Sequence, residues 1–141
     1  MREYNLFISH SWNYSNAYDS LKTKLDEAPY FYYKDYSVPE EKALTIYNKA
    51  FYEQELRNKI TEKMKFCSVV LIFAGVYASY SDSIQMEISI AQELGKPIIA
   101  IEYWGSERTS AIVKNAADKV VKWNTNSIVD AIKELSLWKT L

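Results

Sequence analysis

The chain has 141 residues with a formal net charge of −1, and 48% of them are hydrophobic and 25% charged. These values are typical of a globular domain, and a charge near zero without a basic cluster argues against a nucleic-acid partner. The one cysteine, Cys67, excludes an internal disulfide and argues against a secreted disulfide scaffold. We therefore expect a single domain over residues 1–141.

The beginning of the chain lacks the pattern of a targeting signal. Residues 1–5 lead directly into a strand pattern, without the long apolar stretch and small-residue cleavage site of a signal peptide. No apolar run approaches the roughly 20 residues that a membrane span needs. The sequence thus predicts a cytoplasmic protein without a membrane partner.

Strand and helix patterns alternate through the first half of the chain. Helices are indicated by apolar residues at helical spacing, and strands by short apolar or aromatic runs. The irregular stretch at 34–52 has no clear period. In order, the predicted elements are a strand at 6–8, a helix with apolar residues at 18, 21 and 25, an aromatic strand at 30–33, a helix with apolar residues at 56, 60 and 64, and a strand at 68–73.

The alternation continues to the end of the chain. Gly95 follows a helical stripe as a predicted C-cap, and Pro97 prevents the helix from continuing. The later predicted elements are a helix with inward residues at 84, 88, 91 and 94, a strand at 98–101, a short helix at 109–117, a weak strand at 120–121, and a helix with apolar residues at 128, 132 and 135.

This order predicts an α/β fold, a flavodoxin-like three-layer sandwich with a five-stranded parallel sheet and strand order 2-1-3-4-5. In such folds ligands bind beyond the carboxyl ends of the strands, at the switch point beside the first strand. Three segments are expected there: 9–13, 36–45 and 74–87.

Several kinds of chemistry are excluded by the residues available. His10 is the only histidine, and no cluster of Cys and His with metal-ligand spacing is present, so we expect no metal. No nucleotide-binding glycine motif occurs among only three glycines. A phosphorylated receiver domain would need acidic residues where this chain has Ser9, His10 and Ser11.

Glu87 lies on the inward face of its predicted helix, together with Ile84 and Ile88. Burying a carboxylate without a partner is costly, so its position needs an explanation. A structural role near the helix N-terminus is one explanation, although the capping position relative to Asp82 would be Gln85. A catalytic carboxylate in a cleft is the other, and position alone leaves both open.

Three segments resemble TIR domains. Leu6-Phe7-Ile8-Ser9-His10-Ser11-Trp12 resembles the opening strand and loop. The run from Gly75 to Ser81, followed by Ile84-Gln85-Met86-Glu87-Ile88, resembles the segment with the catalytic glutamate, and residues 95–101 resemble the strand that follows. The likeness spans about residues 4–135 and is nearest to short bacterial TIR-like proteins related to the TIR subunit of Thoeris anti-phage systems.

The resemblance implies an NAD glycohydrolase or ADP-ribosyl cyclase with Glu87 as catalytic residue. NAD would be the substrate, with no separate cofactor. It further implies self-association through TIR–TIR contacts and a separate effector protein that reads the product. As substrate-binding residues we predict Ser9, His10, Ser11, Trp12, Tyr36, Ser37, Tyr77 and Ser83.

These binding assignments compete with structural alternatives. The residues after the first strand could instead satisfy loop backbone groups, Tyr36 and Ser37 could lie in an ordinary surface loop, and Tyr77 could be a packing residue. Ser83 stands where the family commonly has Trp, so Tyr80, Trp12 or Trp104 would have to supply an aromatic wall.

Two other functions compete with NAD cleavage. A TIR domain that assembles without chemistry is suggested by Ser83 and by the aromatic residues between Tyr30 and Tyr52. An enzyme of the nucleoside deoxyribosyltransferase type shares the fold and a glutamate in the cleft. Neither the product nor the trigger of an NAD-cleaving enzyme is readable from the sequence.

Overall fold

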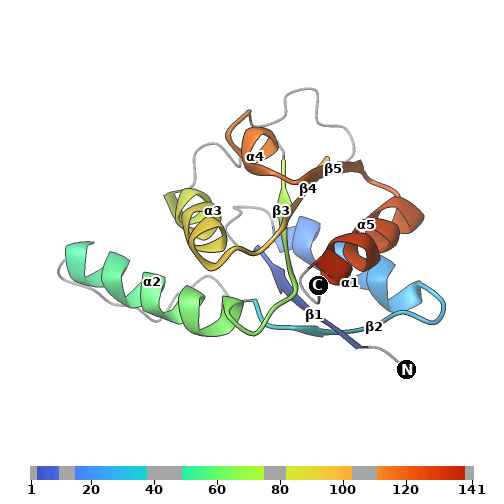
Figure 1. The fold of residues 1–141 in the computed structure, drawn as a ribbon, viewed down its shortest axis with the longest axis horizontal. Coiled ribbons are helices and arrows are strands. Elements are labelled where there is room, and N and C mark those ends of the chain that lie inside the picture. The colour runs from blue at the N-terminus through green and yellow to red at the C-terminus, as the bar shows by residue number, and fades with distance from the viewer. Residues whose placement is uncertain (1–2, 10–14, 38–48, 75–81, 103–110, 139–141) are drawn as a thin grey trace.

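The computed structural model describes residues 3–9, 15–37, 49–74, 82–102 and 111–138. They form an alternating series of strands and helices around one parallel sheet (Figure 1). The strands are β1 (Glu3–Ile8), β2 (Tyr32–Asp35), β3 (Val69–Phe73), β4 (Ile98–Glu102) and β5 (Lys119–Lys122), and the helices are α1 (Ser15–Glu27), α2 (Lys49–Met64), α3 (Asp82–Leu94), α4 (Ala111–Ala116) and α5 (Thr125–Trp138).

The strand order is β2-β1-β3-β4-β5, and every neighbouring pair is parallel. This confirms the predicted flavodoxin-like α/β fold class. Parallel strands need crossover connections, and here the helices of those crossovers lie on both faces of the sheet. In Figure 1, α2, α3 and α4 lie on one side and α1 and α5 on the other.

The core consists of two apolar layers, one on each side of the sheet. Leu6 and Ile8 of β1 pack with residues of α1 and α5, whereas Phe7 packs with residues of α2 and α3. This alternation follows from the two-residue period of a strand. All five residues of β3 are buried because helices cover both faces of this central strand, which explains its continuous apolar sequence.

The end of α3 has the predicted glycine cap. Gly95 adopts a φ of 68°, a left-handed conformation that costs glycine little. Its N–H donates to the Gln92 carbonyl at 3.2 Å, and the Lys96 N–H donates to the Ala91 carbonyl at 2.8 Å. These two bonds are those of a Schellman motif, and they turn the chain directly into β4.

The second strand starts later than the sequence pattern predicts. The prediction placed it at 30–33, whereas β2 runs from Tyr32 to Asp35. Tyr30 has a φ of 58° and a side chain that is 86% exposed, so it belongs to the turn after α1. The high strand propensity of an aromatic run does not reveal that its first residue is needed to reverse the chain.

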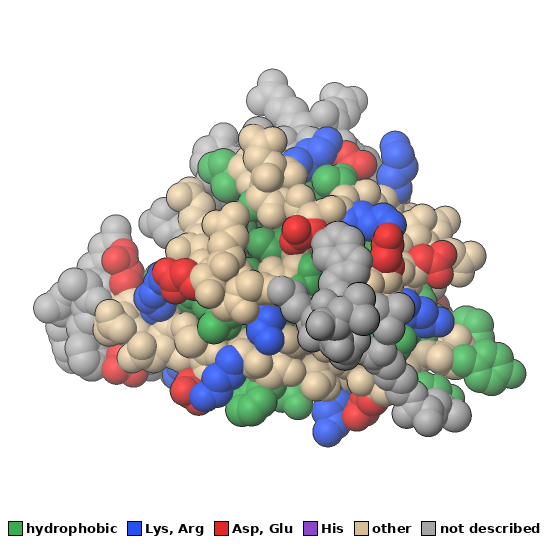
Figure 2. Space-filling view, viewed as in Figure 1, with side chains coloured by type: hydrophobic (Ala, Val, Ile, Leu, Met, Phe, Trp, Pro, Cys, Tyr) green, Lys and Arg blue, Asp and Glu red, His purple; other side chains and the backbone are tan. Residues whose placement is uncertain are grey.

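The surface shows no separation of charge on the face in view. Figure 2 shows Lys and Arg side chains interspersed with Asp and Glu side chains among the described residues of that face. Of the helices that the structure describes, none has both the length and the apolar character of a membrane-spanning segment.

Cys67 offers a direct test of the packing on the α2 side. Its side chain is 2% exposed, and its Sγ lies 3.5 Å from the Lys63 carbonyl oxygen. Burial raises the pKa of the thiol to about 12 from an ordinary 9.0. Because the thiolate is the reactive form, its population at pH 8 falls roughly a thousandfold.

We therefore expect alkylation of Cys67 by iodoacetamide at pH 8 to be at least about a hundredfold slower in the folded protein than in the guanidinium-unfolded chain. Mass spectrometry of quenched samples measures both rates. Similar rates in the two states would contradict the packing described for this thiol.

Candidate active site

Ser9 and Glu87 meet at the carboxyl end of the sheet, although 78 positions separate them in the sequence. Ser9 follows β1, and its N–H still donates to the Leu71 carbonyl of β3 at 2.9 Å. Since Leu6 and Ile8 face α1 and α5, Ser9 faces the α3 side. Its Oγ donates a hydrogen bond of 2.7 Å to Oε1 of Glu87.

Glu87 points inward because it lies on the apolar stripe of α3. Ile84, Ile88 and Ala91 are buried on the same side of the helix, and Gln85 is exposed on the other. Helical spacing brings these positions together, and the predicted inward orientation of Glu87 is confirmed. Its side chain is 2% exposed.

Glu87 lies beside an apolar layer of the core. Ala74 follows β3, is buried, and donates its N–H to the Ile101 carbonyl at 2.8 Å. Ala74, Ile84 and Ile88 belong to the apolar layer between the sheet and α3. The electrostatic interactions of a carboxylate are stronger and reach farther in an apolar medium than in water. A hydrogen bond from a hydroxyl partly replaces the hydration that the buried carboxylate has lost.

This arrangement suits a carboxylate that acts by charge and by accepting hydrogen bonds. It can stabilise a developing positive charge, orient a sugar hydroxyl, or attack a carbon centre. Within the segments that the structure describes, no group of three or more His, Cys, Asp or Glu side chains is placed to hold a metal ion.

Tyr36 and Ser37, both predicted to bind substrate, are positioned by other contacts. The ring of Tyr36 stacks with that of Phe66, with centroids 6.2 Å apart. The backbone N–H and the hydroxyl of Ser37 both donate to Asp35 Oδ1, the former at 2.9 Å. Their role as substrate ligands stays a prediction.

The other predicted site residues fall outside the described part of the chain. His10, Ser11, Trp12 and Tyr77 belong to segments that the structure does not describe. Ser83 lies in the first turn of α3, but its side chain is likewise outside the description.

An ion pair near this end of the sheet was not predicted from the sequence. Lys114 of α4 lies 3.3 Å from Glu102 Oε2, at the carboxyl end of β4. Glu102 follows Ala100 by two residues, so it faces the same side of the sheet as α3. The predicted strand stopped at Ile101; extending it by one residue would have placed this carboxylate at the ligand-binding edge.

Asp35 is another functional candidate that the sequence analysis missed. It ends β2 and accepts hydrogen bonds from Tyr18 and from Ser37. The signal was available, because an Asp side chain often accepts a hydrogen bond from the backbone N–H two residues later and so forms a turn.

Two surface grooves lie away from Glu87. One, of about 570 Å³, runs along β2 and the end of α1, and the other, of about 310 Å³, lies near Gly95 and Asp118. Asp118 accepts the Ile98 N–H at 2.8 Å, which places the second groove at the start of β4, the opposite edge of the sheet. The buried Glu87, and not either open groove, marks the candidate site, because a buried carboxylate is costly and calls for a compensating role.

The family model for the TIR-like domain of Thoeris protein ThsB matches residues 7–108, more than half of the 141-residue chain. The match covers both Ser9 and Glu87. No curated protein matches the chain by sequence.

Several solved structures share the fold. A conserved protein from Enterococcus faecalis V583 aligns with a TM-score of 0.60 and 9% identity, over 94% of this chain and 99% of that one. A 2-deoxyribosyltransferase from Bacillus psychrosaccharolyticus gives 0.58 and 14%, over 89% and 90%. The CMP N-glycosidase BcmB from Clostridium botulinum gives 0.52 and 14%, over 92% and 98%. At these identities the likeness shows a common fold.

The energetic role of the Ser9 hydroxyl can be tested against a second buried serine. Ser136 of α5 is also fully buried, but its Oγ has no hydrogen-bond partner within the described residues. Removing a hydroxyl that bonds a buried carboxylate costs about 1.5–3 kcal/mol, whereas removing an unpartnered one is close to neutral.

We expect Ser9→Ala to lower the free energy of unfolding by about 1.5–3 kcal/mol and Ser136→Ala to change it by less than about 0.5 kcal/mol or to raise it. Urea unfolding followed by circular dichroism measures both variants. Equal losses in the two variants would contradict a specific role for the Ser9–Glu87 hydrogen bond.

Proposed function

This chain belongs to the family of TIR-like domains of the Thoeris protein ThsB, and we propose that it cleaves the bond between nicotinamide and ribose in NAD. The observation that carries the proposal is the buried Glu87, held by the Ser9 hydroxyl at 2.7 Å on the carboxyl side of β1. A fold with ligand sites at that edge and a fixed carboxylate beside it favour chemistry there.

The reaction needs little acid catalysis. When the bond from C1′ of the ribose to nicotinamide breaks, its electron pair returns to the pyridinium nitrogen, and nicotinamide leaves as a neutral molecule. The ribose then carries positive charge over C1′ and the ring oxygen, and a fixed carboxylate stabilises that charge. Glu87 has this role in our proposal, and Ser9 keeps the carboxylate in place.

The positively charged ribose must then accept a nucleophile. With water, a proton is lost and ADP-ribose forms; with a nucleophilic atom of the ADP-ribose itself, the same bond formation closes a ring. NAD is therefore a substrate in this proposal, and no separate cofactor takes part. We propose that His10, Ser11, Trp12, Tyr36, Ser37, Tyr77 and Ser83 contribute to binding it.

The family membership suggests the biological setting. In our proposal the released nucleotide is a signal in anti-phage defence that a separate effector protein reads in the cytoplasm, and self-association through TIR–TIR contacts brings the enzyme to full activity. Ser83 at the position where tryptophan is common implies that another aromatic side chain borders the nicotinamide.

A second candidate function is cleavage of a nucleoside or nucleotide at its N-glycosidic bond. Two proteins of similar fold are named a 2-deoxyribosyltransferase and a CMP N-glycosidase. The chemistry would again rely on a buried carboxylate beside a sugar. The family match favours NAD, and the two candidates differ in substrate and not in the residue that they require.

The test compares Glu87 with a carboxylate on the same helix that has no role in the proposal. Gln at position 87 keeps the size and the hydrogen-bonding capacity of the side chain and removes its charge. We expect Glu87→Gln to lower nicotinamide release by at least about a hundredfold, and Glu93→Gln to leave it unchanged, because Glu93 is exposed and pairs with Arg57 at 2.7 Å.

Nicotinamide and the ADP-ribose products are separated by chromatography at high protein concentration, with deoxynucleosides and CMP offered in parallel. Release of base from nucleosides or CMP but not from NAD would select the second candidate. Self-association with no turnover of any substrate would identify a TIR module that assembles without catalysis, and equal activity of wild type and Glu87→Gln would remove Glu87 from the mechanism.

A further inference from the structure

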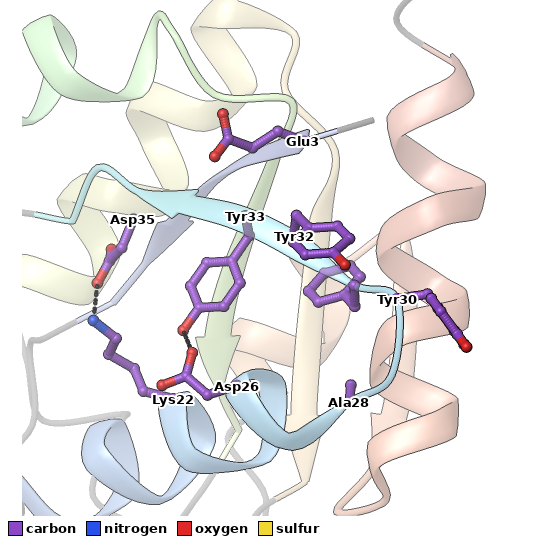
Figure 3. A pocket seen from close by; sticks show the side chains of 9 residues that line it. Glu3, Lys22, Asp26, Ala28, Tyr30, Tyr32, Tyr33 and Asp35 are labelled. Atoms are coloured by element: carbon purple, nitrogen blue, oxygen red, sulfur yellow. Dashed lines mark hydrogen bonds and ion pairs between the residues drawn. The ribbon is translucent and has the colours of Figure 1, made fainter. Parts of the chain in front are cut away.

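A polar network lies on the opposite face of the sheet from Glu87, at the end of β2. Its centre is the Asp35 carboxylate, which accepts hydrogen bonds from the Tyr18 hydroxyl and from the hydroxyl and N–H of Ser37. Lys22 contributes its charge from 3.7 Å. Figure 3 shows Lys22 of α1 and Asp35 of β2 directed toward each other beside the groove along β2.

The network joins two parts of the chain, the end of β2 and the beginning of α1, beside the end of β1. The Tyr36 N–H donates to the Leu6 carbonyl at 2.8 Å, which carries the β2–β1 pairing one residue beyond β2 and brings Ser37 alongside the last residues of β1. Tyr18 lies in the first turns of α1, the helix that follows β1 along the chain. One carboxylate thus fixes the end of β2 and the beginning of α1.

Asp35 does more than attach a helix to a strand. Another pair already joins the same two elements: the Tyr33 hydroxyl donates to Asp26 Oδ1 at 2.7 Å. What distinguishes Asp35 is the capture of the Ser37 N–H, which turns the backbone where β2 ends. A side chain that binds its own backbone two residues later sets the direction in which the chain leaves the strand.

We propose that Asp35 is a positioning residue for substrate binding at the Ser9–Glu87 site, acting through Ser37 and α1. This inference rests on the proposed function, because it assigns the end of β2 to the binding of the same substrate. Asp35 touches no reacting atom in the proposal. It determines where the end of β2 lies relative to the end of β1.

The Tyr18 hydroxyl keeps its proton over the ordinary working range of pH because its pKa is raised. Burial, and then the hydrogen bond to Asp35, raise the pKa of Tyr18 to about 12. Tyr18 therefore remains a neutral donor to Asp35 well above neutral pH. The positioning effect should accordingly be the same at pH 7 and pH 9.

The kinetic test uses Asp35→Ala, Asp35→Asn and Tyr33→Phe. We expect Asp35→Ala to raise KM for NAD roughly tenfold with kcat changed less than about twofold. Asp35→Asn should recover most of the loss, because an amide oxygen can still accept the Ser37 N–H. Tyr33→Phe removes a hydrogen bond between the same helix and strand and should leave KM unchanged.

A second readout is independent of turnover. Hydrogen exchange of the Ser37 amide should be roughly tenfold or more faster in Asp35→Ala than in wild type, and near wild type in Asp35→Asn and Tyr33→Phe. Faster exchange without any NAD activity in wild type would reject the proposed function and still support the structural role of Asp35. Unchanged exchange and unchanged KM in Asp35→Ala would overturn the positioning role, as would an equal rise of KM in Tyr33→Phe.

Discussion

The carboxyl end of the sheet is organised around a buried carboxylate and the hydroxyl that bonds it. Glu87 lies in the apolar layer between α3 and the sheet, where an ionised group without a partner would be strongly unfavourable. The Ser9 hydroxyl meets that requirement from another segment of the chain. Because Ser9 is also held by Leu71 of β3, the position of the carboxylate is tied to the sheet itself and not only to its own helix.

The architecture of the sheet is what makes such an arrangement rigid. β3 lies at its centre, with β1 on one side and β4 on the other, and all five of its residues are buried. Ser9 and Ala74 extend the hydrogen bonding of β1 and β3 past their last strand residues. Close packing of a protein interior leaves a buried side chain little room to move, so folding fixes the position of the carboxylate in advance.

Local sequence patterns predicted most of the fold and one half of the site. The stripe of Ile84, Ile88 and Ala91 was enough to orient Glu87 inward, since helical period alone decides which residues share a face. The hydrogen-bond partner of Glu87 could not be predicted in this way. A contact between positions 9 and 87 depends on how β1 and α3 meet in space. The sequence analysis placed Ser9 at the right edge but left open whether its hydroxyl would bind substrate or loop backbone groups, and it did not predict a side-chain partner. The start of β2 was misplaced for a related reason: at Tyr30 the need to reverse the chain outweighed the strand propensity of its ring.

Two carboxylates lie at the carboxyl edge of the sheet, on its opposite faces and in different surroundings. On the α3 face, Glu87 is buried beside an apolar layer and accepts a hydrogen bond from the neutral Ser9 hydroxyl. On the α1 face, Asp35 is surrounded by donors, and Lys22 partly offsets its charge. A carboxylate compensated in this way exerts little field at a distance and is suited to holding structure. The two carboxylates have the same chemistry, and the several donors around Asp35 are the physical reason to propose that it holds the geometry of the strand ends.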